Sequence, residues 1–121
     1  MNLSTVGWVA LGAGIGAPTR YVVDRLVTER TGASRIPLGL LVVNIFGSAL
    51  LGFILGLDNP TLAIVVGSGF CGAMTTFSGF AWESTALWRE QRAAFWVFIA
   101  LMTGLCVASL WITWSITSAL A

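Results

Sequence analysis

Four long apolar stretches, separated by short polar segments, dominate this sequence. A helix needs about 20 apolar residues to cross the hydrocarbon core of a bilayer, and this length is met at residues 6–27, 36–57, 61–88 and 93–120. Turn-forming or charged residues interrupt the pattern at Asp58-Asn59-Pro60 and at Arg89-Glu90-Gln91-Arg92. We therefore predict an all-helical membrane protein with four transmembrane helices that form a single domain over residues 1–121.

The composition agrees with a lipid environment and excludes several classes of function. Hydrophobic residues make up 57% of the chain and charged residues 9%, whereas a soluble domain has about 25% charged residues. The chain has no lysine or histidine, so no basic cluster is available to bind nucleic acid. The sequence offers no nucleophile–base pair and no cluster of metal-ligating side chains, so we predict that the protein is not an enzyme. Cys71 and Cys106 are interpreted as small buried hydrophobic residues.

The arginines are distributed asymmetrically along the four predicted helices. The N-terminus, the loop at Asp58 and the C-terminus fall on one side of the membrane, and that side has no lysine or arginine. The other side has the arginines at positions 25, 30, 35, 89 and 92. The positive-inside rule places that side in the cytoplasm. We therefore expect a multi-pass protein of the cell (plasma) membrane with both termini outside.

Small residues recur at four-residue spacing in three of the stretches. Such ladders allow helix backbones to approach closely in a membrane, where no hydrophobic effect drives helices together. They comprise Gly12 and Gly16, then Ser48, Gly52 and Gly56, then Ala100, Gly104 and Ala108. A bundle of four short helices has little interior, so several close-packing faces predict an oligomer.

The third stretch is interrupted by glycines and hydroxyl groups. Gly67, Gly69 and Gly72 precede the paired threonines Thr75 and Thr76, and glycine weakens a helix. Non-helical backbone at membrane depth is tolerated only where it is buried in protein or lines a cavity. Broken membrane helices also expose carbonyls that coordinate small cations. We predict that the third helix is broken here and that an ion binds near the break.

Side chains suited to a small anion follow the predicted break. Phe77 and Phe80 lie one helical turn apart, and the edge of a phenyl ring is electropositive. The hydroxyl groups of Thr76 and Ser78 could replace water around an anion. A phenylalanine pair at this spacing is also typical of a packed core, but the neighbouring hydroxyl groups favour the anion site.

Asn44 is the strongly polar residue in the middle of the second stretch. Its side chain offers two N–H donors and an acceptor. A polar side chain at mid-membrane is usually functional, yet an asparagine there also serves to hydrogen-bond neighbouring helices. The residue alone leaves both roles open.

Three motifs in the chain resemble those of one known family. The stretch Gly69–Glu83 closely resembles the signature of the Fluc (CrcB) fluoride channels, G-x-x-G-x-x-T-T-F-S-T-F followed by a glutamate. Gly16–Tyr21 is similar to the family's G-x-x-x-R-Y, and Val43–Ser48 to its V-N-x-x-G-S. Length, number of spans and motif order also agree, so the resemblance covers essentially the whole chain.

The resemblance implies an antiparallel dimer with two fluoride pathways and a structural sodium ion that is not transported. The sodium ligands would be the backbone carbonyls of Gly72 and Thr75 from both subunits. Arg20 would face an aqueous vestibule and Glu83 the mouth of the pathway; the alternative for both is snorkelling to the membrane interface. The fluoride pathway would include Asn44, Thr76, Phe77, Ser78 and Phe80.

The chain departs from the family pattern at positions that usually supply hydrogen-bond donors. Gly79 replaces the last threonine of T-F-S-T-F, and Leu40 stands four residues before Asn44, where the family often has threonine. The fourth stretch also lacks a Tyr-then-Ser track. We therefore expect one or both fluoride pathways to be thinner or asymmetric.

The arginine asymmetry bears on the expected partner. An antiparallel homodimer needs one sequence inserted in both orientations, which favours a weak charge bias, and this sequence is strongly biased. Two partners remain open, a second copy of the chain or an oppositely oriented homologue.

Taken together, the sequence predicts a passive fluoride channel that lets the anion leave the cytoplasm and so gives resistance to fluoride. A non-conducting structural or partner subunit is one alternative, supported by Leu40 and Gly79. A small multidrug-type exporter is another, but it needs a mid-span glutamate, and the nearest acid in the first stretch, Asp24, lies close to the helix end.

Overall fold

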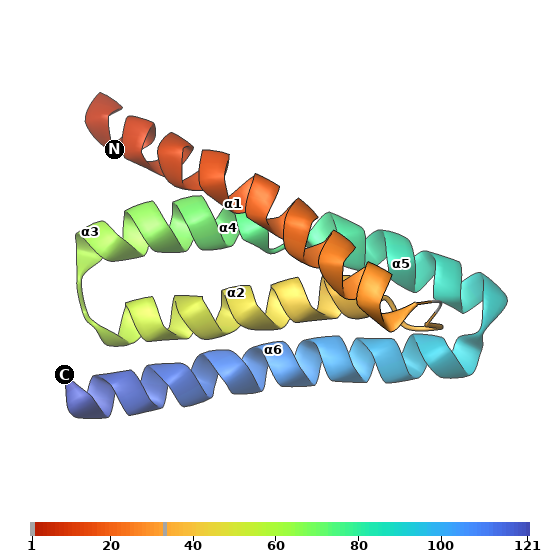
Figure 1. Cartoon of the computed structure of the whole chain (residues 1–121). Coiled ribbons are helices and arrows are strands. Elements are labelled where there is room, and N and C mark those ends of the chain that lie inside the picture. The colour runs from red at the N-terminus through yellow and green to blue at the C-terminus, as the bar shows by residue number, and fades with distance from the viewer. Residues whose placement is uncertain (1, 33) are drawn as a thin grey trace.

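The computed structural model describes residues 2–32 and 34–121, and within them every regular element is helical (Figure 1). Four helical rods follow one another along the chain. The third rod consists of several consecutive elements, whereas each of the others is a single helix. The elements are α1 (Leu3–Thr31), α2 (Leu38–Gly56), α3 (Pro60–Leu62), η1 (Ala63–Cys71), α4 (Gly72–Met74), α5 (Phe77–Glu90) and α6 (Arg92–Leu120).

Local sequence signals set the helix ends. The Asn2 side chain caps α1 by accepting a hydrogen bond from the backbone N–H of Thr5 at 2.9 Å, and Gly32 follows the helix with a positive φ of 69° that suits glycine. Asn59 caps the start of the third rod through the N–H of Leu62 at 3.1 Å, with Pro60 in the first turn. The turn predicted at Asp58-Asn59-Pro60 is therefore confirmed.

The first half of the third rod is wound differently from an ordinary α-helix. η1 is a π-helix of nine residues, in which backbone hydrogen bonds span five residues. At its end the N–H of Gly72 donates to the carbonyl of Gly67. π-helical segments are rare and frequently occur at functional sites. The sequence pattern predicted a helix here but not this winding.

The bundle is held together by two main helix contacts. α2 packs along α6, and α1 crosses over η1 (Figure 1). The buried core lies where α2, α4, α5 and α6 meet, and it consists of Leu40, Leu41, Val43, Met74, Leu87, Phe98 and Met102.

Two of the three predicted small-residue ladders form these contacts. A Cβ atom added to Gly12 would lie 2.6 Å from the carbonyl oxygen of Val65 in η1. Gly52 and Gly56 of α2 likewise face α6, where added Cβ atoms would meet Leu110 and Thr117. The third ladder, Ala100–Gly104–Ala108 on α6, is exposed, and nothing lies within 4 Å of a Cβ at Gly104.

Three helical segments are long and apolar enough to cross a membrane. They are α2, the run Pro60–Glu90 and α6. Within the described residues α1 is not among them, although it is 29 residues long. The protein is therefore a membrane protein, and the first predicted span at 6–27 stays a prediction.

The start of α1 and the C-terminus lie at the same end of the bundle as the connection between α2 and α3 (Figure 1). The end of α1 and the turn between α5 and α6 lie at the opposite end. Arg30 in the last turn of α1, and Arg89 and Arg92 at the turn between α5 and α6, therefore lie at one end of the molecule. The cytoplasmic location of that end stays a prediction.

Replacing Gly16 by alanine is expected to lower the thermal stability of the protein, although alanine favours a helix over glycine by about 0.8–1.0 kcal/mol. The added methyl group would overlap the carbonyl oxygen of Phe70 in η1, and overpacking costs about 1–3 kcal/mol. Gly14→Ala is the matched control, because nothing lies within 4 Å of a Cβ at that position. Thermal unfolding in detergent, followed by tryptophan fluorescence, measures both variants. An unchanged midpoint for Gly16→Ala would show that α1 does not rest on η1 in this way.

Candidate functional site

Two residues with extended backbone separate α4 from α5. Thr75 has φ −81° and ψ 158°, and Thr76 has φ −147° and ψ 123°. In a continuous α-helix the N–H of Thr76 would donate to the carbonyl of Gly72, four residues earlier. It donates instead to Oδ1 of Asn44 in α2, at 2.9 Å. The Gly72 carbonyl thereby loses its usual helical donor.

Asn44 holds this interruption from the side. Its Oδ1 accepts from the N–H of Thr76, and its Nδ2 donates to the carbonyl of the same residue at 3.3 Å. The Nδ2 group also donates to Sδ of Met102 in α6 at 3.4 Å. Asn44 is 6% exposed, where unpaired polar groups are costly. The interhelical hydrogen bond left open by the sequence is therefore present, and any contact with an anion would use the same N–H groups.

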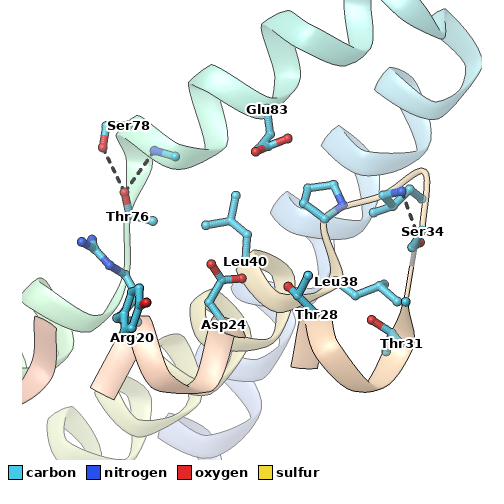
Figure 2. A pocket seen from close by; sticks show the side chains of 15 residues that line it. Arg20, Asp24, Thr28, Thr31, Ser34, Leu38, Leu40, Thr76, Ser78 and Glu83 are labelled. Carbon is cyan, nitrogen blue, oxygen red and sulfur yellow. Dashed lines mark hydrogen bonds between the residues drawn. The ribbon is translucent and has the colours of Figure 1, made fainter. Parts of the chain in front are cut away.

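Hydroxyl groups complete the hydrogen bonding of the interruption. Oγ1 of Thr76 caps α5 by accepting from the N–H of Gly79 at 3.1 Å, and it lies 3.0 Å from Oγ of Ser78 (Figure 2). Both the N–H and the hydroxyl of Thr75 donate to the carbonyl of Cys71, each at 2.9 Å. The start of α5 is consequently well defined.

A cavity of about 530 Å³ opens on one side of the interruption (Figure 2). We call it the polar cavity. Arg20 of α1 and Glu83 of α5, both predicted for the entrance region, line it together with Thr76 and Ser78. Its remaining lining includes Tyr21, Asp24, Thr28, Thr31, Ser34, Leu40 and Gly79.

Asp24 also lines the polar cavity, although the sequence did not predict it as a site residue. Asp24 follows Arg20 by one helical turn and therefore lies on the same face of α1. This spacing is the sequence signal that could have identified Asp24 as a cavity residue. Figure 2 shows Asp24 pointing toward Leu40, below Glu83. The ion pair found in the described residues is Arg25–Glu29 at 2.8 Å, so Arg20 shares the polar cavity with the carboxylates of Asp24 and Glu83 without forming a direct ion pair.

A second cavity, of about 370 Å³, lies on the other side of the interruption. We call it the apolar cavity. Thr76 lines both cavities and therefore stands between them. The rest of the apolar cavity's lining includes Asn44, Gly47, Ser48, Cys71, Gly72, Thr75, Phe77, Phe80, Met102 and Cys106. The backbones of Gly72 and Thr75, predicted to bind sodium, thus border this cavity.

The phenylalanine pair borders the apolar cavity. The ring centroids of Phe77 and Phe80 are 5.9 Å apart, so the two rings share a face as predicted. Phe80 also packs against Phe98, with ring centroids 5.5 Å apart, and it belongs partly to the core. The Phe77 side chain is 79% exposed, so packing within the chain does not account for it.

The two departures from the family signature lie next to each other in space. A Cβ atom on Gly79 would lie 3.2 Å from Cδ1 of Leu40 and 3.1 Å from Cγ2 of Thr76. Leu40 is 8% exposed and stands beside Thr76 in the polar cavity (Figure 2). A side chain at position 79 would therefore require Leu40 or Thr76 to shift.

This arrangement defines a helical membrane protein whose third apolar rod is interrupted between two cavities. The model of the family described as "CrcB-like protein, Camphor Resistance (CrcB)" matches residues 7–115. The chain belongs to this family, as its motifs indicated. It is a family of ion channels, not of enzymes.

Three relatives illustrate the match. Fluoride-specific ion channel FluC 1 of Geobacillus kaustophilus is 41% identical over 108 residues, which cover 88% of this chain and 90% of the relative. FluC 2 of Rhodococcus jostii is 39% identical over 119 residues, covering 94% and 99%. FluC 1 of Nocardia farcinica is 51% identical over 83 residues, covering 68% of this chain and 58% of the relative.

Removing the Asn44 amide is expected to destabilise the interruption. In Asn44→Leu the N–H and carbonyl of Thr76 lose their partners, and each unsatisfied buried group costs about 1–3 kcal/mol. We expect a lower unfolding temperature and faster hydrogen exchange of the Thr76 amide. Thr103→Val is the control, because it removes a polar group from the same cavity lining without breaking this pair of bonds. Equal exchange rates in the two variants would contradict the role given to Asn44.

Positions 40 and 79 are expected to be energetically coupled. Gly79→Thr alone places a side chain against Leu40 and Thr76, whereas Leu40→Thr alone leaves unfilled space beside Gly79. The double variant should lose less stability than the two single losses together, with a coupling of about 0.5–3 kcal/mol. Unfolding midpoints of the four proteins in a double-mutant cycle measure this coupling. Additive effects would mean that the two positions do not share the space.

Proposed function

We propose that this chain is a subunit of a fluoride-specific ion channel through which fluoride leaves the cytoplasm passively, so that the cell resists its toxicity. Family membership supports the proposal, as do the names of relatives that match across most of the chain. The channel acts by replacing the water shell of a small anion with protein donors, and it needs no chemical step.

The observation that carries this proposal is the position of Thr76 between the two cavities. Its hydroxyl and that of Ser78 face the polar cavity, and Asn44 reaches its backbone from the apolar cavity. An anion that enters the polar cavity beside Arg20 would meet these donors at the interruption. The exposed ring of Phe77 and the neighbouring ring of Phe80 would then offer their electropositive edges.

A second subunit in antiparallel orientation would complete the channel. The exposed ladder Ala100–Gly104–Ala108 is suited to close helix packing and has no partner within the described part of the chain. Phe77 is likewise exposed beside the apolar cavity. A partner that covers these residues would exclude lipid and enclose an anion path.

A sodium ion would serve as a structural clamp between the two subunits. Gly72 is exposed, and its carbonyl lacks its usual helical donor, while Thr75 has extended backbone. Carbonyl oxygens are ligands suited to hard cations, and interrupted membrane helices supply them. The same two carbonyls from each chain would hold the ion, and no step of fluoride transport passes through it.

The membrane orientation of this chain decides whether its partner is a second copy or a homologue. The arginines at one end of the molecule favour a single orientation, with both termini outside, and an oppositely oriented homologue would then supply the other half. Relatives are numbered FluC 1 and FluC 2, which agrees with more than one such chain per organism. A homodimer remains the alternative.

A non-conducting partner subunit is the second candidate function. Leu40 and Gly79 together replace two hydroxyl-bearing positions of the family pattern with an apolar contact beside Thr76. A pathway without these donors dehydrates an anion less well. Such a chain would support the pathway of its partner and conduct poorly itself.

Efflux from liposomes tests the proposal. The purified chain, alone and together with a homologue from the same organism, is reconstituted into vesicles loaded with fluoride or with chloride. We expect release of fluoride without release of chloride in at least one of the two preparations. Release only with the homologue present would favour an obligate heterodimer. No fluoride release from either preparation would refute the channel function.

A variant of Phe77 separates transport from folding. Phe77→Ala should reduce fluoride efflux at least tenfold while leaving the unfolding temperature nearly unchanged, because this side chain is 79% exposed. Trp82→Ala is the matched control, since Trp82 lies on the same helix, is 77% exposed and lines neither cavity. Equal flux through the two variants would remove Phe77 from the pathway.

A further inference from the structure

Three sulfur-containing side chains line the apolar cavity. Cys71 reaches it from η1, and Met102 and Cys106 reach it from α6. Met102 and Cys106 are one helical turn apart, and the thiol of Cys106 donates to Sδ of Met102 at 3.9 Å. Both cysteines are free thiols. Cys71 is buried, as predicted for a small apolar residue, whereas Cys106 is half-buried. Hydropathy does not explain why three sulfur-containing side chains line one cavity.

The Met102–Cys106 pair also lies next to the interruption. Sδ of Met102 accepts a hydrogen bond from Asn44 at 3.4 Å, and Asn44 in turn binds the backbone of Thr76. A chain of contacts therefore runs from Cys106 through Met102 and Asn44 to Thr76. An ion bound to the two sulfur atoms would therefore lie next to Asn44, the residue that binds the backbone of Thr76.

Thiolate and thioether are soft ligands, which select soft metal ions such as Cu⁺. A zinc–sulfur bond is about 2.3 Å long, and two sulfur atoms 3.9 Å apart are closer than twice that length, so one metal ion can contact both. Among the residues that the structure describes, no aspartate, glutamate or histidine lines the apolar cavity, so a hard cation would find no charged side-chain ligand there.

The charge balance favours a monovalent ion. Binding breaks the S–H bond of Cys106 and forms a metal–sulfur bond, and the released proton passes to water. One thiolate and one monovalent cation form a neutral pair, whereas a divalent ion held by the same two ligands would leave a net positive charge. Uncompensated charge is expensive in surroundings of low dielectric constant.

We propose that Met102 and Cys106 form a binding site for a soft monovalent cation, Cu⁺ or Ag⁺, and that an ion bound there obstructs the apolar cavity beside Asn44 and Thr76. Cys71 shares the cavity but is not required as a ligand. The binding step stands independently of transport. The obstruction rests on the proposed channel function, because it is observed as a block of fluoride efflux.

Silver is the practical probe, because it needs no reducing agent. The purified chain in chloride-free detergent buffer is incubated with silver nitrate, freed of unbound metal, and analysed for silver by mass spectrometry. We expect one retained Ag⁺ per chain. Cys106→Ser should abolish retention, and Met102→Leu, which keeps the side-chain volume but loses the sulfur, should weaken binding at least tenfold. Cys71→Ser should still retain one ion.

Two results would overturn the binding site. One is retention of silver by Cys106→Ser at the level of the unmodified chain, and the other is loss of retention in a folded Cys71→Ser variant. Thermal unfolding of each variant shows that a loss of binding is not a loss of fold. Both tests remain valid for a chain that conducts no fluoride.

The obstruction is tested separately in the liposomes that release fluoride. Silver nitrate should reduce fluoride efflux through the unmodified chain at least tenfold, and Cys106→Ser should be insensitive to the same concentration. Silver bound at one ion per chain without an effect on efflux would overturn the obstruction. Absence of efflux before silver is added would instead count against the channel function itself.

Discussion

The structure depends on one constraint, which is that backbone polar groups removed from water need partners. The extended residues Thr75 and Thr76 interrupt an otherwise helical run of 31 residues, and in an apolar environment such an interruption is stable only if its N–H and C=O groups are bonded. Asn44 meets this need by pairing with both backbone groups of Thr76. The hydroxyl of Thr76 then starts α5. Asn44 therefore stabilises the interruption beside which both cavities lie.

Close helix packing also positions the side chains around the interruption. Gly52 and Gly56 allow α2 and α6 to approach closely, and this approach brings Met102 within reach of Asn44. On the other side, Gly12 lets α1 rest on the backbone of η1, which places Arg20 at the polar cavity. The glycine ladders on α1 and α2 therefore do more than pack helices together. They also determine which side chains surround the interruption.

The sequence predicted the helices, the turn at Asp58 and most of the residues around the interruption, because hydropathy, glycine content and motif spacing are local properties. It did not predict the π-helical winding of η1, the place of Asp24 in the polar cavity, or the convergence of sulfur atoms from η1 and α6. These features depend on the rotation and register of one helix against another. Asn44 shows the boundary clearly: its polarity at mid-helix marked it as important, but only the packed structure identifies Thr76 as its partner.

The contact between Leu40 and Gly79 has a consequence for the history of the sequence. A threonine introduced first at position 79 would meet an occupied space, and a threonine introduced first at position 40 would leave a gap. Either order passes through a less stable protein, so the two positions are expected to change together or through a small residue at position 40. In comparisons between relatives they should be treated as one inherited character.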